Sequence, residues 1–216
     1  DVLTGARVTH IAISPDGRGA RVFYEQEGQA ASLEGDIVVV AIPGDAVLEL
    51  FDEPRPAWKA FFPHVRYTRV GIVYHLIEHD DPALDRGGIM FPRKEPWKLS
   101  ALGWNRKSDG RILAMSDLKA HLYDPQMSDQ ELCQVITEEV IRAVPAFAGR
   151  IVDQMVFRWH RKVPAMPPGY LGALRAFKEN PQEGPVYFCG DYLIAGSTGA
   201  ALASGWQAAG RVLQKM

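Results

Sequence analysis

The chain has 216 residues, of which 47% are apolar and 23% are charged, a composition typical of an ordinary globular protein. Its 24 basic and 26 acidic side chains leave a formal net charge of −2, which offers no electrostatic case for binding nucleic acid. No apolar run is long enough to cross a bilayer, although composition leaves peripheral association with a membrane open. Cys133 and Cys189 lie in apolar segments, as buried thiols do, and we therefore expect a cytoplasmic protein.

The first fifty residues have the pattern of strands followed by a short helix. Partial alternation over residues 2–13 and the segment 20–25 predict two strands, with a turn over residues 14–17 between them. The apolar run over residues 37–44 predicts one continuous buried strand. Residues 45–51 are expected to form a short helix where this strand ends.

The composition changes at Pro54, which begins a proline-rich stretch and marks the crossing into a different layer. Further strands are predicted over residues 65–76, 89–92, 99–104, 112–115 and 151–160. Ser128 with Glu131 three residues later forms a capping box. Helical spacing follows in Leu132, Ile136, Val140 and Val144, and Pro145 is expected to close this helix. The region therefore predicts a mixed antiparallel sheet with a helix.

The most informative stretch lies near the end of the chain. Four apolar residues, Val186 to Cys189, predict a strand that is covered on both faces. Gly190 allows a turn or a close approach, and Asp191 places an acceptor at the strand's carboxyl end, where open α/β sheets bind ligands. Ser197, Thr198 and Gly199 then open a terminal helix, whose free N–H groups suit an anionic or electron-rich ligand edge.

This terminal stretch resembles the carboxyl-terminal FAD motif of the flavin amine oxidase superfamily, which includes amine oxidases, protoporphyrinogen oxidases and phytoene-desaturase-like enzymes. The resemblance is carried by Gly190-Asp191-Tyr192-Leu193, Ser197-Thr198-Gly199-Ala200, Ser204-Gly205 and Ala208-Ala209. It implies an α/β fold with some α+β character: part of a two-domain FAD-dependent oxidoreductase, with a dinucleotide-binding sheet and a mixed antiparallel substrate-domain sheet with helices. The alternative is a strand and an alanine-rich packing helix that bind no ligand.

The resemblance also implies roles for individual residues. In the family, the acid at the position of Asp191, beside Gly190, holds the ribityl–pyrophosphate part of FAD. The helix start that faces the flavin pyrimidine corresponds to Ser197, Thr198, Gly199 and Ala200.

Two further cofactor contacts are implied outside the terminal motif. Val8 matches a valine whose backbone meets the adenine, and a place in a core strand explains it about as well. Trp159 opens a proline-rich segment, 159–170, that resembles the one leading back under the flavin, so it is a candidate neighbour of the ring system. A tryptophan at a sheet edge explains it equally well. A short helix over residues 171–179 and a loop over 181–185 are expected to follow.

The domain organisation is also an expectation from the resemblance. Residues 1–53 and 156–216 would form the carboxyl-terminal part of an FAD-binding domain, and residues 54–155 a substrate-binding domain. Family members are longer and open with a Gly-x-Gly-x-x-Gly unit that binds the ADP part of FAD, whereas the glycines near the start of this chain have the wrong spacing. We therefore expect a carboxyl-terminal half only, whose partner is an amino-terminal FAD-binding half on a separate chain or a missing segment.

Two other patterns are weaker. His75-Leu76-Ile77-Glu78-His79 matches a zinc peptidase motif that requires a helix, but it lies in a strand pattern, where residues four apart are separated by roughly 13 Å. No metal site is predicted there. Four aromatic residues could line a flat apolar substrate pocket or simply belong to the core: Tyr67, Tyr74, Trp104 and Tyr123.

The expected function is FAD-dependent oxidation of a C–N or C–C bond in an apolar or amine substrate, by hydride transfer to the flavin. The sequence names no catalytic residue, because no lysine matches the position that many amine oxidases place near the flavin. The motif segments resemble the desaturase and protoporphyrinogen oxidase branch somewhat more closely than the amine oxidase branch. The alternative is a non-catalytic subunit or fragment that completes the FAD and substrate site of a partner chain.

Overall fold

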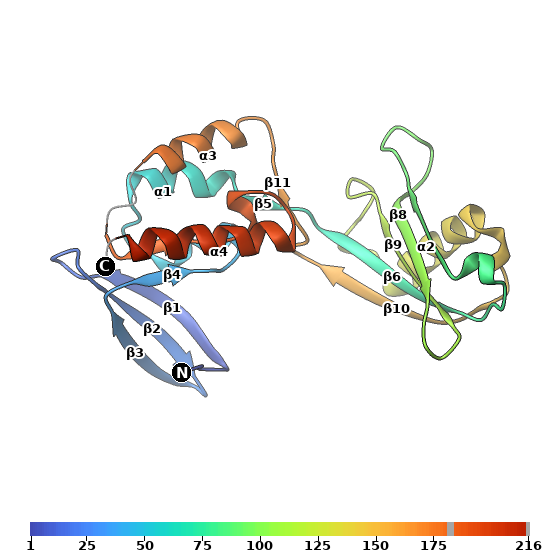
Figure 1. Cartoon of the computed structure of the whole chain (residues 1–216), viewed down its shortest axis with the longest axis horizontal. Helices are drawn as coiled ribbons and strands as arrows, with labels where there is room; N and C mark the ends of the chain where they lie inside the picture. The colour runs from blue at the N-terminus through green and yellow to red at the C-terminus, as the bar shows by residue number, and fades with distance from the viewer. Residues whose placement is uncertain (181–183, 215–216) are drawn as a thin grey trace. The chain divides into compact units, whose positions relative to one another are not determined.

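The computed structural model describes residues 1–180 and 184–214 and divides the chain into two compact units (Figure 1). Unit 1 comprises Asp1–Tyr67 and Val163–Met216, and unit 2 comprises Thr68–Lys162. Both boundaries fall later in the chain than the predicted ones after residues 53 and 155. The predicted loop over 181–185 lies mostly outside the described residues. Within the described ranges, no helix is both long and apolar enough to span a membrane.

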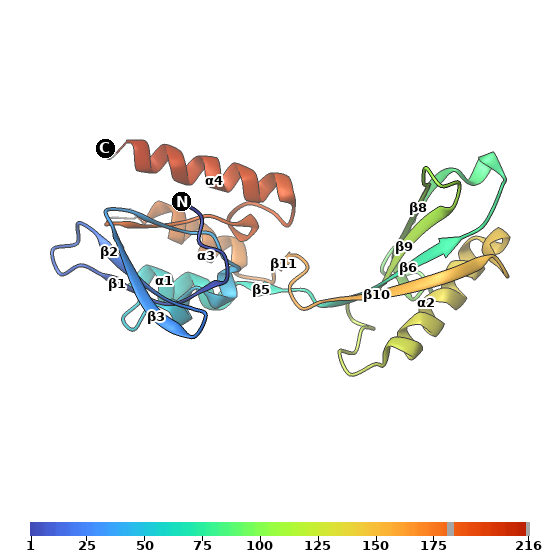
Figure 2. The same ribbon diagram turned by 90° about the horizontal axis from the view of Figure 1, so that it is seen from below.

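Unit 1 begins with a three-stranded antiparallel meander, which Figure 2 shows from a second direction. Its strands are β1 (Ala6–Ile13), β2 (Ala20–Gln26) and β3 (Gln29–Gly35). The first two were predicted, whereas every residue of β3 is exposed, so this strand has no apolar alternation that a sequence could reveal. The register of β1 against β2 shifts between Val8 and His10, which makes Thr9 the extra residue of a β-bulge.

The second sheet of unit 1 is a parallel pair formed by β4 (Val38–Val40) and β12 (Val186–Phe188). Every residue of β12 is buried, as the apolar run predicted. The expected continuous strand over residues 37–44 is much shorter, because the chain leaves β4 and enters two 3-10 turns, η1 (Gly44–Ala46) and η2 (Leu48–Leu50). These two turns replace the expected short helix.

Aromatic rings fill the core of unit 1 beside this parallel pair. They come from α1 (Pro56–Phe61), η3 (Phe62–His64), α3 (Tyr170–Glu179) and β12. The rings of Phe61 and Phe177 stack with centroids 4.7 Å apart, and Phe62 meets Phe188 edge-on at 4.9 Å. The first contact joins α1 to α3, which lie side by side in Figure 1, and the second joins η3 to β12. The short pair β5 (Arg66–Tyr67) and β11 (Pro164–Ala165) and the terminal helix α4 (Thr198–Leu213), which packs against β12, complete unit 1.

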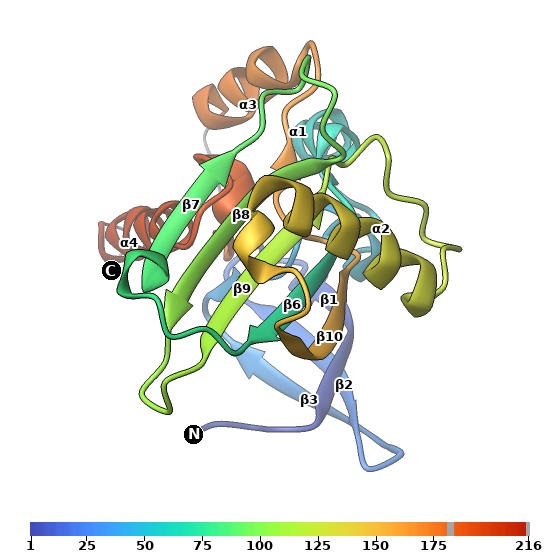
Figure 3. The ribbon, with the colours of Figure 1, turned by 90° about the vertical axis from the view of Figure 1, so that its right-hand side faces the viewer.

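Unit 2 is a five-stranded sheet in the order β10-β6-β9-β8-β7, with α2 (Asp129–Ala143) packed across one face (Figure 3). The strands are β6 (Val70–Ile77), β7 (Arg86–Met90), β8 (Leu99–Arg106), β9 (Ile112–Leu118) and β10 (Ile151–Trp159). All pairs are antiparallel. The long strand expected over residues 65–76 is divided into β5 and β6. Two further 3-10 turns are η4 (Pro82–Leu84) and η5 (Pro145–Phe147).

The helix of unit 2 begins and ends where its sequence predicts. Ser128 Oγ accepts from the N–H of Glu131 at 3.2 Å, and the Glu131 carboxylate accepts from the N–H of Ser128 at 2.8 Å, which confirms the capping box. Leu132, Ile136 and Val140 are fully buried against the sheet. The helix stops at Ala143, just before Pro145.

His75 lies inside β6, which confirms that the His-x-x-Glu-His pattern is not on a helix. Its side chain is fully buried, and Nε2 lies 2.9 Å from Thr137 Oγ1 on α2. Nδ1 has no hydrogen-bond partner in the described part of the chain. Burial disfavours the charged imidazole and lowers the pKa of His75 from 6.5 to about 4.

Acid should therefore destabilise unit 2 through His75. Between pH 6.5 and about 4 the unfolded chain binds a proton that the folded chain does not, so the free energy of unfolding falls as the pH falls. The loss from this residue approaches about 3 kcal/mol near pH 4. Urea unfolding across this range should show a weaker pH dependence for His75→Leu than for the unsubstituted chain. If the free energy of unfolding depends equally on pH in the two proteins, the lowered pKa of His75 is contradicted.

Candidate functional site

The parallel pair of unit 1 brings two chain segments to one edge of the sheet. Because β4 and β12 run in the same direction, their carboxyl ends lie together. The chain after β4 reaches Gly44 there, and the chain after β12 reaches Gly190 and η6 (Asp191–Leu193). Asp191 therefore lies at the carboxyl edge of the parallel strands, where ligands bind in open α/β folds.

Gly190 is held by close packing and by a hydrogen bond. A Cβ at this position would collide with the ring of Tyr192. The N–H of Gly190 donates to Ser204 Oγ at 2.7 Å, and Ser204 Oγ donates to the carbonyl of Ala201 at 2.8 Å. Ser204 is only 1% exposed. This serine therefore ties α4 to the end of β12, a role that the sequence did not indicate beyond a place in a run of small residues.

The first turn of α4 is capped and otherwise uncovered. Ser197 Oγ accepts from the N–H of Ala200 at 3.1 Å, and its carbonyl accepts from Ala201 at 3.0 Å. Within the described chain this leaves the N–H groups of Thr198 and Gly199 as the donors at the helix start. Both residues are exposed, and a Cβ on Gly199 would have no neighbour within 4 Å. Of the four predicted residues, only Ala200 turns its side chain into the fold.

The carboxyl group of Asp191 is partly buried beside several hydroxyl groups. Burial raises the pKa of Asp191, while hydrogen bonds from the N–H groups of Tyr192 and of Asp191 itself and from the Tyr67 hydroxyl oppose the rise. Tyr170, fully buried on α3, donates its hydroxyl to the carbonyl of Tyr192. Burial, with smaller contributions from Tyr67 and Asp191, raises the pKa of Tyr170 to about 12. Asp191 thus lies near tyrosine hydroxyl groups and accepts a hydrogen bond from that of Tyr67.

The four aromatic residues grouped by sequence do not line one pocket. Tyr67 lies in unit 1 beside Asp191. Trp104 and Tyr123 pack against the core under α2, whereas Tyr74 lies on the opposite, open face of the unit 2 sheet. Alternation along the strands separates Tyr74 from the α2 side, because successive side chains point to opposite faces.

Val8 and Trp159 both lie on edge strands, and their side chains are exposed. Val8 lies on β1, an edge strand of the meander, and is 40% exposed beside the bulge at Thr9, so a core position is wrong for it. Trp159 ends β10, the edge strand of the unit 2 sheet, and is 49% exposed. Because Trp159 belongs to unit 2, its contact with the cofactor stays a prediction, as does the adenine contact of Val8.

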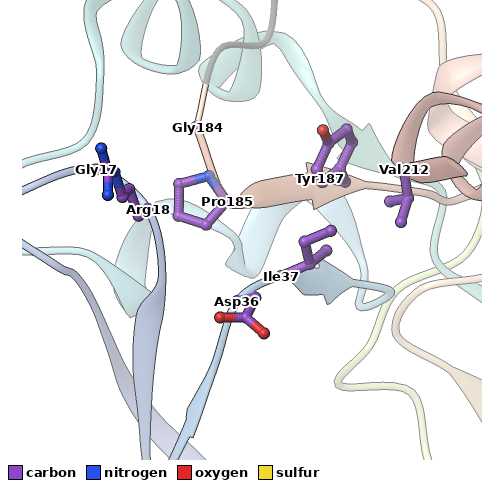
Figure 4. Close-up of a pocket in the computed structure, with 8 residues that line it drawn as sticks. All are labelled: Gly17, Arg18, Asp36, Ile37, Gly184, Pro185, Tyr187 and Val212. Carbon is purple, nitrogen blue, oxygen red and sulfur yellow. The ribbon is translucent and has the colours of Figure 1, made fainter. Parts of the chain in front are cut away.

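An open cleft in unit 1 lies away from this site (Figure 4). It is lined by Gly17, Arg18, Asp36, Ile37, Gly184, Pro185, Tyr187 and Val212. Ile37 and Pro185 precede β4 and β12, so the cleft is at the amino ends of the parallel strands. Asp191 is at the carboxyl ends, and the cleft therefore plays no part in the candidate site.

Unit 2 presents an apolar groove on the sheet face that α2 leaves open. Its lining includes Tyr74, Leu76, Leu113, Met155 and Phe157. The rings of Tyr74 and Phe157 meet edge-on with centroids 5.5 Å apart, and Met155 is 56% exposed. Within the described chain no helix of unit 2 covers this face, and an exposed apolar patch of this kind is typical of a surface that contacts another molecule or segment.

Comparison with known proteins gives the family to which this fold and this strand edge belong. The family model described as flavin containing amine oxidoreductase matches residues 1–213, and the chain belongs to this family. The resemblance found in the sequence is thereby confirmed.

Solved structures share the fold at low sequence identity. A variant of putrescine oxidase superposes with a TM-score of 0.77 at 17% identity, over 98% of this chain and 49% of that chain. Cyclohexylamine oxidase from Brevibacterium oxydans IH-35A gives a TM-score of 0.74 at 17% identity, over 96% and 48%. A protein described as a protoporphyrinogen oxidase, from Exiguobacterium sp. 255-15, gives a TM-score of 0.71 at 15% identity, over 98% of this chain and 47% of that chain. The chain spans about half the length of these structures.

The family's cofactor is a flavin, and the site fits FAD by its donors and acceptors. The exposed N–H groups of Thr198 and Gly199 suit carbonyl oxygens of a flavin ring, and the Asp191 carboxyl suits the hydroxyl groups of a ribityl chain. The open space at Gly199 leaves room for a ring against the helix start.

Replacement of Gly190 by alanine should destabilise unit 1, because the new Cβ would meet the Tyr192 ring. We expect a loss of about 1–3 kcal/mol in the free energy of unfolding, measured by urea titration. Gly205→Ala is the control, since a Cβ there has no neighbour within 4 Å and alanine favours a helix by up to about 1 kcal/mol. Equal changes in the free energy of unfolding for the two substitutions would contradict the close packing of Gly190 against the Tyr192 ring.

Proposed function

We propose that this chain forms the carboxyl-terminal half of an FAD-dependent oxidoreductase that oxidises a C–N or C–C bond of a small apolar or amine substrate. The observation that carries the proposal is the shared edge of β4 and β12, where Asp191 follows one strand and α4 begins with two uncovered N–H groups. Membership of the flavin-containing family supports the cofactor. The amine oxidases among the similar structures support the substrate class by fold alone.

Each residue of the site has a binding task in this proposal. The Asp191 carboxylate accepts a hydrogen bond from the ribityl chain, and the N–H groups of Thr198 and Gly199 donate to the pyrimidine end of the flavin. The positive end of the α4 dipole favours negative charge there. FAD, when bound, supplies the acceptor for a hydride from the substrate. Ser204 and Gly190 keep the carboxylate and the helix start at fixed positions.

The substrate would contact the open face of the unit 2 sheet. Tyr74, Leu113 and Phe157 offer a largely apolar surface there, and Asp153 lies at its margin. An apolar surface of this kind suits a flat or aliphatic molecule, since burying it releases about 25 cal/mol for each square ångström. Trp159, on β10 like Phe157, would extend the same surface.

An amino-terminal half is the proposed partner, and two open surfaces of unit 1 support it. The strand β12 is fully buried yet pairs only with β4 in the described chain. The carbonyl of Pro185 and the N–H of Cys189 form hydrogen bonds with β4. Because backbone groups alternate in direction along a strand, those of Val186 and Phe188 point to the opposite edge of β12. A strand of the partner could pair there.

The second open surface is the outer side of α4. Leu202, Trp206 and Leu213 lie at helical spacing and are 65%, 75% and 71% exposed. Such a stripe is costly to leave in water and is typical of a contact with another chain or segment. The partner would cover this stripe and carry the Gly-x-Gly-x-x-Gly unit for the ADP part of FAD, on the same polypeptide or a separate one.

Substitution of Asp191 tests the anchoring role. Asp191→Asn removes the charge at nearly constant volume and should raise the FAD dissociation constant by about tenfold, the effect of one hydrogen bond to a charged group. Asp36→Asn, in the cleft at the opposite edge, is the matched control. The measurement is the flavin absorbance of the purified protein, with intact mass spectrometry of every polypeptide present. Unchanged flavin content in Asp191→Asn would refute the role.

Gly199→Val tests the helix start separately from folding. The added side chain meets no protein atom within 4 Å, so the fold should persist while the flavin edge is crowded. FAD affinity should fall by about 5- to 150-fold, by analogy with overpacking costs of about 1–3 kcal/mol. The same change at Gly210, which also has no neighbour within 4 Å, is the control on the far turn of α4. If both variants keep FAD equally well, the flavin does not approach Gly199.

A further inference from the structure

Tyr67 occupies a fixed place between the two strand ends of unit 1. Its backbone is paired with Pro164 in the β5–β11 ladder. Its hydroxyl oxygen accepts from the N–H of Gly44 at 3.1 Å. Gly44 has little freedom, because a Cβ there would lie 2.9 Å from Val65 and 3.1 Å from the Tyr192 ring. The donor to Tyr67 is therefore set by close packing.

The hydroxyl proton of Tyr67 is directed to Asp191. The Tyr67 hydroxyl oxygen accepts from the N–H of Gly44, and the same hydroxyl donates its hydrogen bond to the Asp191 carboxyl group. A continuous path thus runs from the backbone after β4, through one side chain, to the carboxyl group after β12. The remaining hydrogen bonds to that carboxyl come from the N–H groups of Asp191 and Tyr192, within its own turn.

We propose that Tyr67 is a positioning residue that orients the Asp191 carboxyl group for the ribityl hydroxyls of FAD. The inference rests on the proposed function and adds the residue through which Asp191 is controlled. A carboxylate turns easily about its terminal bond, so a donor from a different strand fixes an orientation that its own turn leaves free. The donor also favours the charged form, which is the better acceptor.

The surrounding titratable groups make this role measurable. Besides Tyr67 of β5, they are Tyr170 of α3, Tyr192 of η6 and Cys189 after β12. Burial raises the pKa of Tyr170 to about 12, and it also raises the pKa values of Tyr192 and Cys189. These three groups stay neutral as the pH falls. Because these three groups do not change charge as the pH falls, a difference in the acid midpoint of FAD release between variants at position 67 reports on the Asp191 carboxyl group.

The experiment compares Tyr67→Phe with Tyr170→Phe in the flavin-loaded protein. Each change removes one tyrosine hydroxyl from the same core, but Tyr170 bonds the Tyr192 carbonyl and not Asp191. The FAD dissociation constant is measured by flavin fluorescence from about pH 8 to about pH 4, with melting temperatures alongside. Loss of the Tyr67 donor removes an interaction that lowers the pKa of Asp191, so the carboxyl protonates at higher pH.

We expect Tyr67→Phe to weaken FAD binding about tenfold at neutral pH and to move the acid midpoint of release to higher pH. Tyr170→Phe should leave that midpoint unchanged. Equal midpoints in all three proteins, or equal shifts in both variants, would overturn the role of Tyr67. If the unsubstituted protein binds no FAD at any pH, the proposed function itself fails.

A second substitution covers the case in which Tyr67→Phe does not fold. Incorporating 3-fluorotyrosine at position 67 keeps the hydroxyl and makes it a stronger donor. The acid midpoint of FAD release should then move to lower pH. An unchanged midpoint would count against the inference.

Discussion

The candidate site depends on one hydrogen bond, from the N–H of Gly190 to Ser204 Oγ. A strand end and a helix start are positioned by different parts of the chain, and nothing in β12 alone fixes where α4 begins. Ser204 Oγ accepts from the N–H of Gly190 at 2.7 Å and donates to the carbonyl of Ala201 at 2.8 Å, so the hydroxyl acts as acceptor and donor inside the fold. Because Ser204 is buried, losing either contact would leave an unpaired polar group away from water. Asp191 and the free N–H groups of α4 share one edge because of this link.

The elements with strong local signals were predictable from the sequence. The buried strand over 186–188, the capped helix that follows Ser128 and the helix that opens at Ser197 all have residues whose local chemistry specifies them. The family and the cofactor followed from the small-residue pattern around Gly190 and α4. Other elements lacked such a signal. Strand β3 is exposed on both faces, and β4 ends at Val40, before the apolar run that predicted it is complete.

The parts of the site that the sequence missed are tertiary contacts. Tyr67 and Asp191 are far apart in the sequence, and no spacing rule relates a tyrosine on one short strand to an acid after another. Ser204 in a helix of small residues could equally have faced water. Val8 was ambiguous because strand valines occur in cores and at edges alike; its exposure on β1 argues against a core position, and the adenine contact stays a prediction. Pattern alone located the motif, but packing decided which side chains support it.

The hydrogen bond from the N–H of Lys162 to the carbonyl of Thr68, 2.9 Å long, has a consequence for how the chain folds. Unit 2 is one contiguous segment, and this bond joins its first and last residues. Unit 1 is made of two segments, and β4 cannot pair until β12 has been synthesised. A unit 2 that folds first would bring the two halves of unit 1 together and reduce the loop-closure entropy of their pairing. The inserted unit would then act as a folding scaffold for the cofactor site, in addition to any contact it makes with substrate.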